Sequence, residues 1–277
     1  MVYNKFYNLG MKNVKICLIS DIHFDKDYNL NIFEEIIKNI KENKPNFICI
    51  SGDILDHADV IDYKDIINLK TFIVDLASIS SVIISLGNHD ITSIKNEKCD
   101  FEKVNNWFLE LNKIENVYYL NNKSLIRNDL CFTSYNPSYE YYGHKEDINF
   151  LINDIDNKIT LNKKYYNILL FHSPINILEN KLIINSSEIK KSNLILSGHM
   201  HNGLILNIFD KKGNRGIIGP YFNLFPKNAR GIITKNIEGR NINLVISGGV
   251  VKISNISSKF LRPLNKLFKV HIEYINI

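Results

Sequence analysis

Short runs of apolar, β-branched residues alternate with longer segments of helical periodicity along most of this chain, and this alternation indicates an α/β fold. Val14–Ser20, Asn46–Ser51 and Ser81–Leu86 are predicted to be buried strands. Between the first two, apolar residues recur every three or four positions, as on one face of a helix that ends before Pro45. A second helix is predicted over 61–79, so the chain begins β-α-β-α-β.

The second half of the chain is richer in predicted strands. Residues 117–136 contain three short runs separated by Asn-Asn and Asn-Asp, which predicts hairpins and the start of a second sheet. No repeat, low-complexity tract or flexible linker interrupts the sequence, so we expect one domain over 1–277. Its parts are core motifs over 14–201, including buried strands at 165–171 and 193–197, an insertion at about 203–231, and closing antiparallel strands over 231–277.

Composition excludes several classes of protein. With 277 residues, 45% hydrophobic and 23% charged, the chain is typical of a globular protein and not of a disordered, collagen-like or coiled-coil one. No apolar run approaches the ~20 residues that span a bilayer, and the N-terminus lacks a signal-peptide core, so we expect a cytoplasmic protein. The net charge of +5 is a mild excess that does not favour nucleic acid. Four cysteines without CxxC spacing predict free, buried thiols.

Metal-binding residue types follow five of the predicted core strands, where a strand passes into a loop. Ligand sites of α/β sheets collect at this edge. Alone, an Asp after a strand is usually a helix cap and a His is usually a hydrogen-bonded core or surface residue. Five matching strand ends are not explained in that way. The candidate ligands are Asp21, His23, Asp53, Asn88, His172, His199 and His201.

The types of ligand restrict the metal. Imidazole with carboxylate and no thiolate suits Mn, Fe, Zn or Ni, and disfavours a calcium cage or an iron–sulfur cluster. Asp21 and His23 are alternate residues of an extended segment, so both can reach one ion, as can His199 and His201. Seven ligands are too many for one ion with an open position, which predicts two divalent ions with Asp53 as the natural bridge.

The ordered series D-x-H, G-D-x-x-D, G-N-H-D, H and G-H-x-H, from Asp21 to His201, resembles the calcineurin-like metallophosphoesterase superfamily. The resemblance implies the metallo-dependent phosphatase fold, a four-layer α/β/β/α sandwich of two mixed sheets flanked by helices. It implies two metal positions that share one aspartate, with Mn expected and Fe, Zn or Ni as alternatives. One position comprises Asp21, His23, Asp53 and His201, and the other comprises Asp53, Asn88, His172 and His199.

The same resemblance implies roles for three residues that do not bind metal. His89 would stand beside the substrate as proton donor or phosphate binder, Asp90 would orient the His89 ring, and Asp56 would steady a ligand or loop. The implied reaction is hydrolysis of a phosphomonoester or phosphodiester by in-line attack of a metal-bridging hydroxide. His89 would protonate the leaving alkoxide, and no covalent phosphoenzyme is needed.

The C-terminal region is similar to a bacterial branch of the superfamily that carries F-P-K-x-x-R-G, here Phe225–Gly231. Arg230 within it is the candidate for a phosphate contact. The chain departs from this branch at three positions. Asn202 replaces a common Gly, Gly248 replaces the usual Arg of S-R-G, and His57 replaces an Arg found in many relatives.

The expected partner is a phosphate-ester substrate, either a small molecule or lipid-linked. The tyrosines of 135–144 could stack on a base or cover the core, and Lys211 and Lys212 are expected in a solvated hairpin of the 204–230 insertion. Two other functions remain open: a nuclease of the same chemistry acting on DNA or RNA, and a non-catalytic scaffold, which should have lost ligands or His89. Peripheral membrane association through Tyr3, Phe6 and Tyr7 or the basic insertion is also left open.

Overall fold

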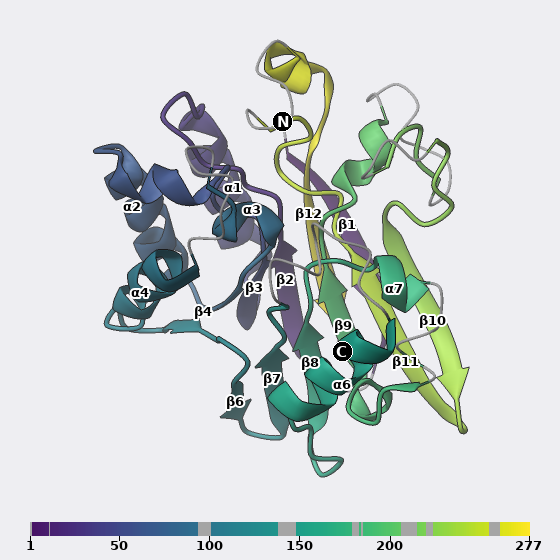
Figure 1. The fold of residues 1–277 in the computed structure, drawn as a ribbon. Coiled ribbons are helices and arrows are strands. Elements are labelled where there is room, and N and C mark those ends of the chain that lie inside the picture. The colour runs from purple at the N-terminus through teal and green to yellow at the C-terminus, as the bar shows by residue number, and fades with distance from the viewer. Residues whose placement is uncertain are drawn as a thin grey trace.

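Two six-stranded sheets pack face to face and carry helices on both outer faces (Figure 1). The computed structural model describes residues 2–10, 12–93, 101–137, 148–178, 183, 185–205, 215–219, 224–254 and 261–277. Each sheet contains both parallel and antiparallel neighbours. The predicted four-layer α/β/β/α sandwich of two mixed sheets is therefore confirmed.

The first sheet has the order β1-β12-β2-β3-β4-β5. Its strands are β1 (Val2–Asn8), β12 (Val270–Asn276), β2 (Lys15–Ile19), β3 (Phe47–Ser51), β4 (Ser81–Ser85) and β5 (Val117–Tyr119). Strands β2 to β5 are parallel, and the crossover helices between them are α1 (Asn31–Asn43), α2 (Ile66–Ala77) and α4 (Phe101–Leu111). Helix α1 ends at Asn43, and the next residue, Lys44, has left-handed backbone angles just before Pro45.

The second sheet has the order β10-β11-β9-β8-β7-β6. Its strands are β6 (Ser124–Arg127), β7 (Leu130–Ser134), β8 (Tyr166–Leu170), β9 (Leu194–Ser197), β10 (Gly231–Ile237) and β11 (Arg240–Ile246). Helix α6 (Ile148–Lys158) packs on its outer face. Shorter helices are α3 (Asn88–Ile91), α7 (Ile175–Leu178), and the 3₁₀ segments η1 (Ala58–Asp62), η2 (Ile189–Lys191), η3 (His201–Leu204) and η6 (Arg262–Leu267).

Three apolar clusters fill the three interfaces between the four layers. Ile19 of β2 packs towards α1, α2 and α4, whereas Leu18 packs between the sheets with Leu170 and Val245. Phe171 belongs to the third cluster, under α6. Successive side chains of a strand point to opposite faces, so these buried strands are apolar at nearly every position. The sheets are thereby fixed against each other, with the carboxyl ends of β2, β3, β8 and β9 available for a site.

The structure corrects two predicted strand placements and adds a strand. Residues 117–119 form β5 of the first sheet, parallel to β4, and the second sheet begins only at β6. The last predicted strand, β12, is not a neighbour of β11 but lies between β1 and β2 in the first sheet. The sequence did not predict β1 as a strand, because its alternating Asn, Lys and aromatic residues lack an apolar run.

Only some of the predicted cysteines, basic residues and tyrosines lie within the described residues. Cys17, Cys49 and Cys131 are buried free thiols, as predicted. Cys99, Lys211, Lys212 and the tyrosines after residue 137 lie outside the described residues. Among the helices that the structure describes, we find none with the length and apolar character needed to cross a bilayer.

Candidate dinuclear metal centre

The carboxyl ends of strands from both sheets bring the predicted ligands together. In one group, Asp21, His23, Asp53 and His201 each offer a ligand atom, and these atoms lie within 4.8 Å of one another. A second group of the same kind contains Asp53, His172 and His199. Because Asp53 belongs to both groups, the arrangement has the form of two cation positions that share one carboxylate.

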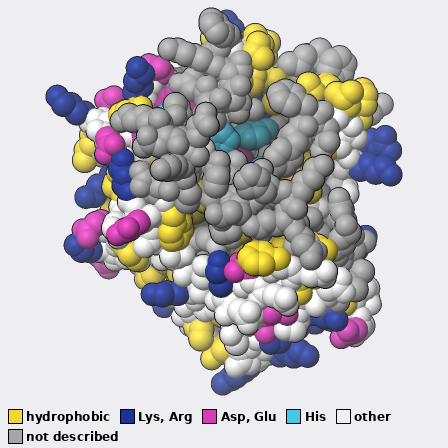
Figure 2. Space-filling model, viewed as in Figure 1, with side chains coloured by type: hydrophobic (Ala, Val, Ile, Leu, Met, Phe, Trp, Pro, Cys, Tyr) yellow, Lys and Arg dark blue, Asp and Glu magenta, His cyan; other side chains and the backbone are white. Residues whose placement is uncertain are grey.

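Distances place the shared carboxylate between imidazoles of the two sheets. Asp53 Oδ2 lies 3.0 Å from His172 Nε2 and 3.7 Å from His23 Nε2. Asp21 Oδ1 lies 3.8 Å from His201 Nε2. All of these side chains are buried apart from His201, which is partly exposed. Figure 2 shows histidine side chains within a hollow of this face of the molecule.

Backbone carbonyls hold the second ring nitrogens of two histidines. His172 Nδ1 lies 2.8 Å from the carbonyl oxygen of Ser51, and His201 Nδ1 lies 3.0 Å from that of Val251. If Nδ1 carries the proton and donates it to the carbonyl, Nε2 is left as the metal-binding nitrogen. These two carbonyls were not predicted, because every residue has one and no sequence signal marks those that bind a histidine.

Unsatisfied buried atoms show that the residues fit divalent cations. Both ring nitrogens of His23 and Oδ1 of Asn88 are buried without a hydrogen-bond partner among the described residues. Such atoms cost about 1–3 kcal/mol each, so they are rare unless a ligand or ion satisfies them. Imidazole, carboxylate and amide donors without thiolate suit Mn, Fe, Zn or Ni. Asn88 begins α3 directly after β4, beside this group, and its assignment to the second position stays a prediction.

Electrostatics favour cation binding at most of the centre, whereas His172 must lose a proton before it can bind a cation. Burial lowers the pKa of His23 and of His199 well below the usual range, so both rings are neutral, as ligands must be. Burial also opposes protonation of His172, but the nearby Asp53 carboxylate overrides this and raises the pKa of His172 to about 9. Although burial disfavours the Asp53 carboxylate, the surrounding imidazoles hold its pKa well below the usual range, so it stays ionised.

The ligand loops have an unusual backbone. Positive φ values are uncommon for residues other than glycine, and they concentrate at functional sites, where each costs on the order of 1–3 kcal/mol. Five of the predicted ligands adopt this conformation: Asp21 (φ 53°), His23 (φ 47°), Asp53 (φ 52°), His199 (φ 69°) and His201 (φ 46°). Hydrogen bonds between loops hold it, including His199 N–H to Asp21 Oδ1 at 3.0 Å.

Glycines make room for the shared carboxylate. A Cβ on Gly87 would lie 2.2 Å from Asp53 Oδ1, and a Cβ on Gly52 would lie 2.6 Å from His172 Nδ1. Gly52 also has a φ of +78°, which other residues rarely adopt. Glycine is therefore required at both positions for the strand ends to approach the centre.

His89 lies beside the centre, and its ring is oriented by a different group from the one predicted. Its Nδ1 lies 3.0 Å from the backbone carbonyl of Asp56, and its own N–H donates to Asp53 Oδ1 at 2.9 Å. Within the described chain Asp90 makes no hydrogen bond to this ring, so its expected role in orienting His89 has no direct contact behind it. The Asp90 carboxylate accepts only backbone N–H groups within the described chain, those of Ile54, Leu55 and Gly87, at 2.7–2.8 Å. Asp90 is the third residue of α3 and reaches back to the amide that begins this helix, as capping residues do.

Asp56 lies where the resemblance implied, next to a ligand. Its Oδ1 is 3.6 Å from His23 Nδ1, on the side of the ring away from Asp53. His23, Asp56 and His89 also form a third group of potential ligand atoms within 4.8 Å of one another. A test of His89 must therefore distinguish a substrate-facing residue from a metal ligand.

Arg230 and Asn202 contact each other, which gives a structural reason for asparagine in place of glycine at position 202. Arg230 is 1% exposed, and its guanidinium donates to Asn202 Oδ1 at 2.8 Å. Asn202 follows His201, so the contact ties the start of β10 to the metal loop. A glycine at 202 could not make it. Direct contact of Arg230 with phosphate stays a prediction.

Two other residues singled out in the sequence have local contacts. Tyr135 is fully buried, and its hydroxyl donates to Asp154 Oδ2 at 2.6 Å, so this tyrosine covers the core. His57, which stands in place of an Arg, is buried with its Nδ1 3.5 Å from Asp59 Oδ2. Neither contact involves the predicted metal ligands.

Gly248, the third departure, is packed against a histidine. A Cβ at this position would lie 2.5 Å from Cγ of His271. We predict that Gly248→Ala lowers the free energy of unfolding by about 1–3 kcal/mol through overpacking, as measured by urea denaturation. Gly248→Ala placed in a His271→Gly background, which also removes the neighbouring Cβ, should cost much less. An equal loss in both backgrounds would contradict the steric explanation.

The facing strand ends of the two sheets assemble two candidate cation positions around one carboxylate, which fits a dinuclear metal site. Residues 14–203 match the family model described as calcineurin-like phosphoesterase. The chain belongs to this family.

Individual relatives align over most of this chain but over less of their own length. A Caenorhabditis elegans protein named as a metallophosphoesterase is 28% identical over 205 residues, which cover 72% of this chain and 39% of that protein. An uncharacterized metallophosphoesterase of Campylobacter jejuni is 28% identical over 221 residues, which cover 78% of this chain and 52% of the relative. The chain thus spans about half of these proteins or less. The crystal structure of a dimetal phosphatase from Danio rerio aligns with a TM-score of 0.45 and 10% identity, over 87% of this chain and 88% of that one.

Proposed function

We propose that this chain is a dinuclear metal-dependent phosphohydrolase that cleaves a phosphomonoester or phosphodiester. The observation that carries the proposal is the sharing of Asp53 by two ligand groups contributed by both sheets. Membership of the calcineurin-like phosphoesterase family supports the same reaction class. The F-P-K-x-x-R-G motif supports the bacterial branch, and a single domain over 1–277 is part of the proposal.

The proposed ligand sets are those implied by the sequence. The first is Asp21, His23, Asp53 and His201, and the second is Asp53, Asn88, His172 and His199. When bound, two divalent cations supply activation of the attacking water and neutralisation of phosphoryl oxygens during in-line displacement. Mn is the proposed metal, with Fe, Zn or Ni as alternatives.

His89 is the proposed proton donor to the leaving group. With its Nδ1–H directed at the Asp56 carbonyl, only Nε2 can face a substrate. The neutral ring would then carry no proton at Nε2, so His89 must be an imidazolium when it acts as an acid. General acid catalysis of this kind contributes about 10²–10⁴-fold. Asp56 thus fixes both the ring orientation and the tautomer.

Turnover of chromogenic esters tests the proposal. The purified protein is stripped with a chelator, reloaded with Mn, and assayed with p-nitrophenyl phosphate and bis-p-nitrophenyl phosphate beside an Asn88→Ala control. We expect Mn-dependent turnover that the control loses, and the preferred ester distinguishes phosphatase from diesterase. A protein that binds no metal would instead be the non-catalytic scaffold. Cleavage confined to DNA or RNA, with strongly salt-dependent binding, would favour the nuclease.

Removal of metal should also lower stability. The centre concentrates unsatisfied buried atoms and five positive φ values, which cations would compensate. A cation at 100 times its Kd stabilises the folded state by about 2.7 kcal/mol per site. We expect Mn to raise the melting temperature of the chelated protein in differential scanning fluorimetry. Asp53→Ala should show no such rise, and identical curves for the chelated and reloaded wild type would contradict the prediction.

A further inference from the structure

The mild net charge of the chain conceals a strongly basic segment. Residues 211–272 contain 12 Lys or Arg and one acidic residue, Glu238, a net charge of +11. The remainder of the chain is therefore at −6, since the total is +5. A charge asymmetry of this size points to an interaction with an anionic partner.

Two parts of this segment are attached by hydrogen bonds at or near His201. The Ile217 N–H donates to the carbonyl of Gly203, two residues after His201, at 2.7 Å. The carbonyl of Val251 lies 3.0 Å from His201 Nδ1. The next two amides, of Lys252 and Ile253, both donate to Asn265 Oδ1 of η6 at 3.0 Å. The described residues 215–219, 224–226 and 261–267 therefore lie close to the metal centre along the chain and through these hydrogen bonds.

Large apolar side chains are exposed on both parts. Leu261, Leu264 and Leu267 are 51%, 40% and 45% exposed, and since a 3₁₀ helix has three residues per turn, they share one face of η6. This segment is the yellow helical turn at the top of Figure 1. Leu224 and Phe225 are 69% and 64% exposed. Figure 2 shows hydrophobic side chains along the upper edge of the face that holds the histidine hollow.

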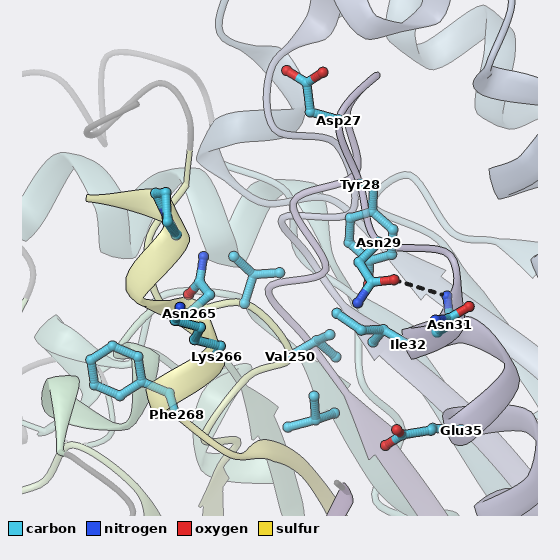
Figure 3. A pocket seen from close by; sticks show the side chains of 13 residues that line it. Asp27, Tyr28, Asn29, Asn31, Ile32, Glu35, Val250, Asn265, Lys266 and Phe268 are labelled. Atoms are coloured by element: carbon cyan, nitrogen blue, oxygen red, sulfur yellow. Dashed lines mark hydrogen bonds between the residues drawn. The ribbon is translucent and has the colours of Figure 1, made fainter. Parts of the chain in front are cut away.

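The leucine face of η6 is turned away from the body of the protein. A cavity of about 590 Å³ separates this segment from the start of α1 (Figure 3). Pro263, Asn265 and Lys266 line the cavity, and none of the three leucines does. The leucines therefore do not pack into the cavity beneath η6, which leaves their face available to a partner.

Exposed cations lie near these apolar residues in the chain, and one of them, Lys266, is on the cavity side of η6. We call the whole set the basic rim: Arg215, Ile217, Leu224, Phe225, Lys227, Leu261, Leu264, Lys266 and Leu267. Its three cations have no ion-pair partner among the described residues. A nucleic acid would use the cations but would favour aromatic platforms, and the exposed apolar residues of the rim are aliphatic except Phe225. Aliphatic side chains near unpaired cations suit the interface of an anionic bilayer.

We propose that the basic rim docks on an anionic phospholipid surface and turns the metal centre towards that surface. Docking requires no turnover, so it is independent of the proposed reaction. It favours the lipid-linked class among the expected substrates, an extension that rests on the proposed function.

Vesicle sedimentation tests the docking. Wild-type protein should bind vesicles of phosphatidylcholine with phosphatidylglycerol, less so at high salt, and should bind pure phosphatidylcholine weakly. Lys266→Glu should weaken binding about five-fold or more, since one basic residue near an anionic surface contributes about 1 kcal/mol. The double variant Leu264→Asp with Leu267→Asp should weaken it on the order of ten-fold or more. Matched controls on α2 are Lys70→Glu and Ile67→Asp, both at exposed positions, and should bind as wild type.

Three results would overturn the proposal. The first is an absence of binding to the anionic vesicles, or equal losses in the α2 controls. The second is binding to DNA as tight as to vesicles, with no effect of the leucine substitutions, which would indicate a nucleic-acid partner. The third is a dimer in light scattering that the leucine substitutions abolish, which would make the rim an interface between two copies. Circular dichroism checks that each variant folds, and none of these results bears on ester hydrolysis.

Discussion

Asp53→Ala should lower kcat/KM for the preferred ester on the order of 10³-fold or more, the equivalent of about 4 kcal/mol of transition-state stabilisation. Asp53 is common to both ligand groups, so its loss should weaken metal binding at both positions. Its side chain also accepts the His89 N–H, which places the proposed proton donor. The measurements are steady-state kinetics with added Mn and metal content by inductively coupled plasma mass spectrometry.

A carboxylate of the same type but outside the centre gives the control. Asp75 is exposed on α2, and Asp75→Ala should keep wild-type activity and about two metals per chain. Circular dichroism should show that both variants fold. If Asp53→Ala kept two tightly bound metals and most of its activity, the shared-carboxylate arrangement would be wrong.

His89→Asn should reduce kcat about 10²–10⁴-fold for an alkyl phosphate, whose alkoxide leaving group needs a proton. The loss should be smaller for a p-nitrophenyl ester, because that leaving group is a weak base. Metal content should not change, since His89 is proposed to face the substrate. Comparing the two esters separates the loss of an acid from a general loss of binding.

The third ligand group suggests a different role for His89, as a metal ligand, which the same experiment can detect. His89 lies with His23 and Asp56 at distances that a metal ion could span. If His89→Asn loses a metal ion, and loses activity equally on both esters, His89 is a ligand. The proposed role as proton donor would then be withdrawn.

The clustering of the candidate ligands could be predicted because the signal is carried by side chains at strand ends. Asp21, Asp53 and His172 each follow an apolar run, and parallel packing brings such ends together whatever the detailed topology. Strand partners were harder to predict. The runs that became β5 and β12 look like strands in the sequence, but local patterning does not say which sheet will receive them.

Other features were missed for identifiable reasons. The backbone carbonyls of Ser51, Val251 and Asp56 orient histidines. Every residue has a backbone carbonyl, so the residue type does not show which of them will bind a histidine. Asp90 was assigned to the His89 ring by resemblance. A short helix beginning at G-N-H-D, with an acid at its third position, would have indicated a helix cap instead. The sequence showed a basic insertion, but the extension of the basic segment to residue 272 was not recognised, because net charge was considered only for the whole chain.

The origin of the ligands in two different sheets has a mechanical consequence. Asp21, His23 and Asp53 lie in loops that follow strands of the first sheet, and His172, His199 and His201 lie in loops that follow strands of the second. Bound cations would therefore link the two sheets to each other at one end of the sandwich. Separation of the sheets at that end would require dissociation of the cations. The rate of metal dissociation would therefore report the rate at which the two sheets separate.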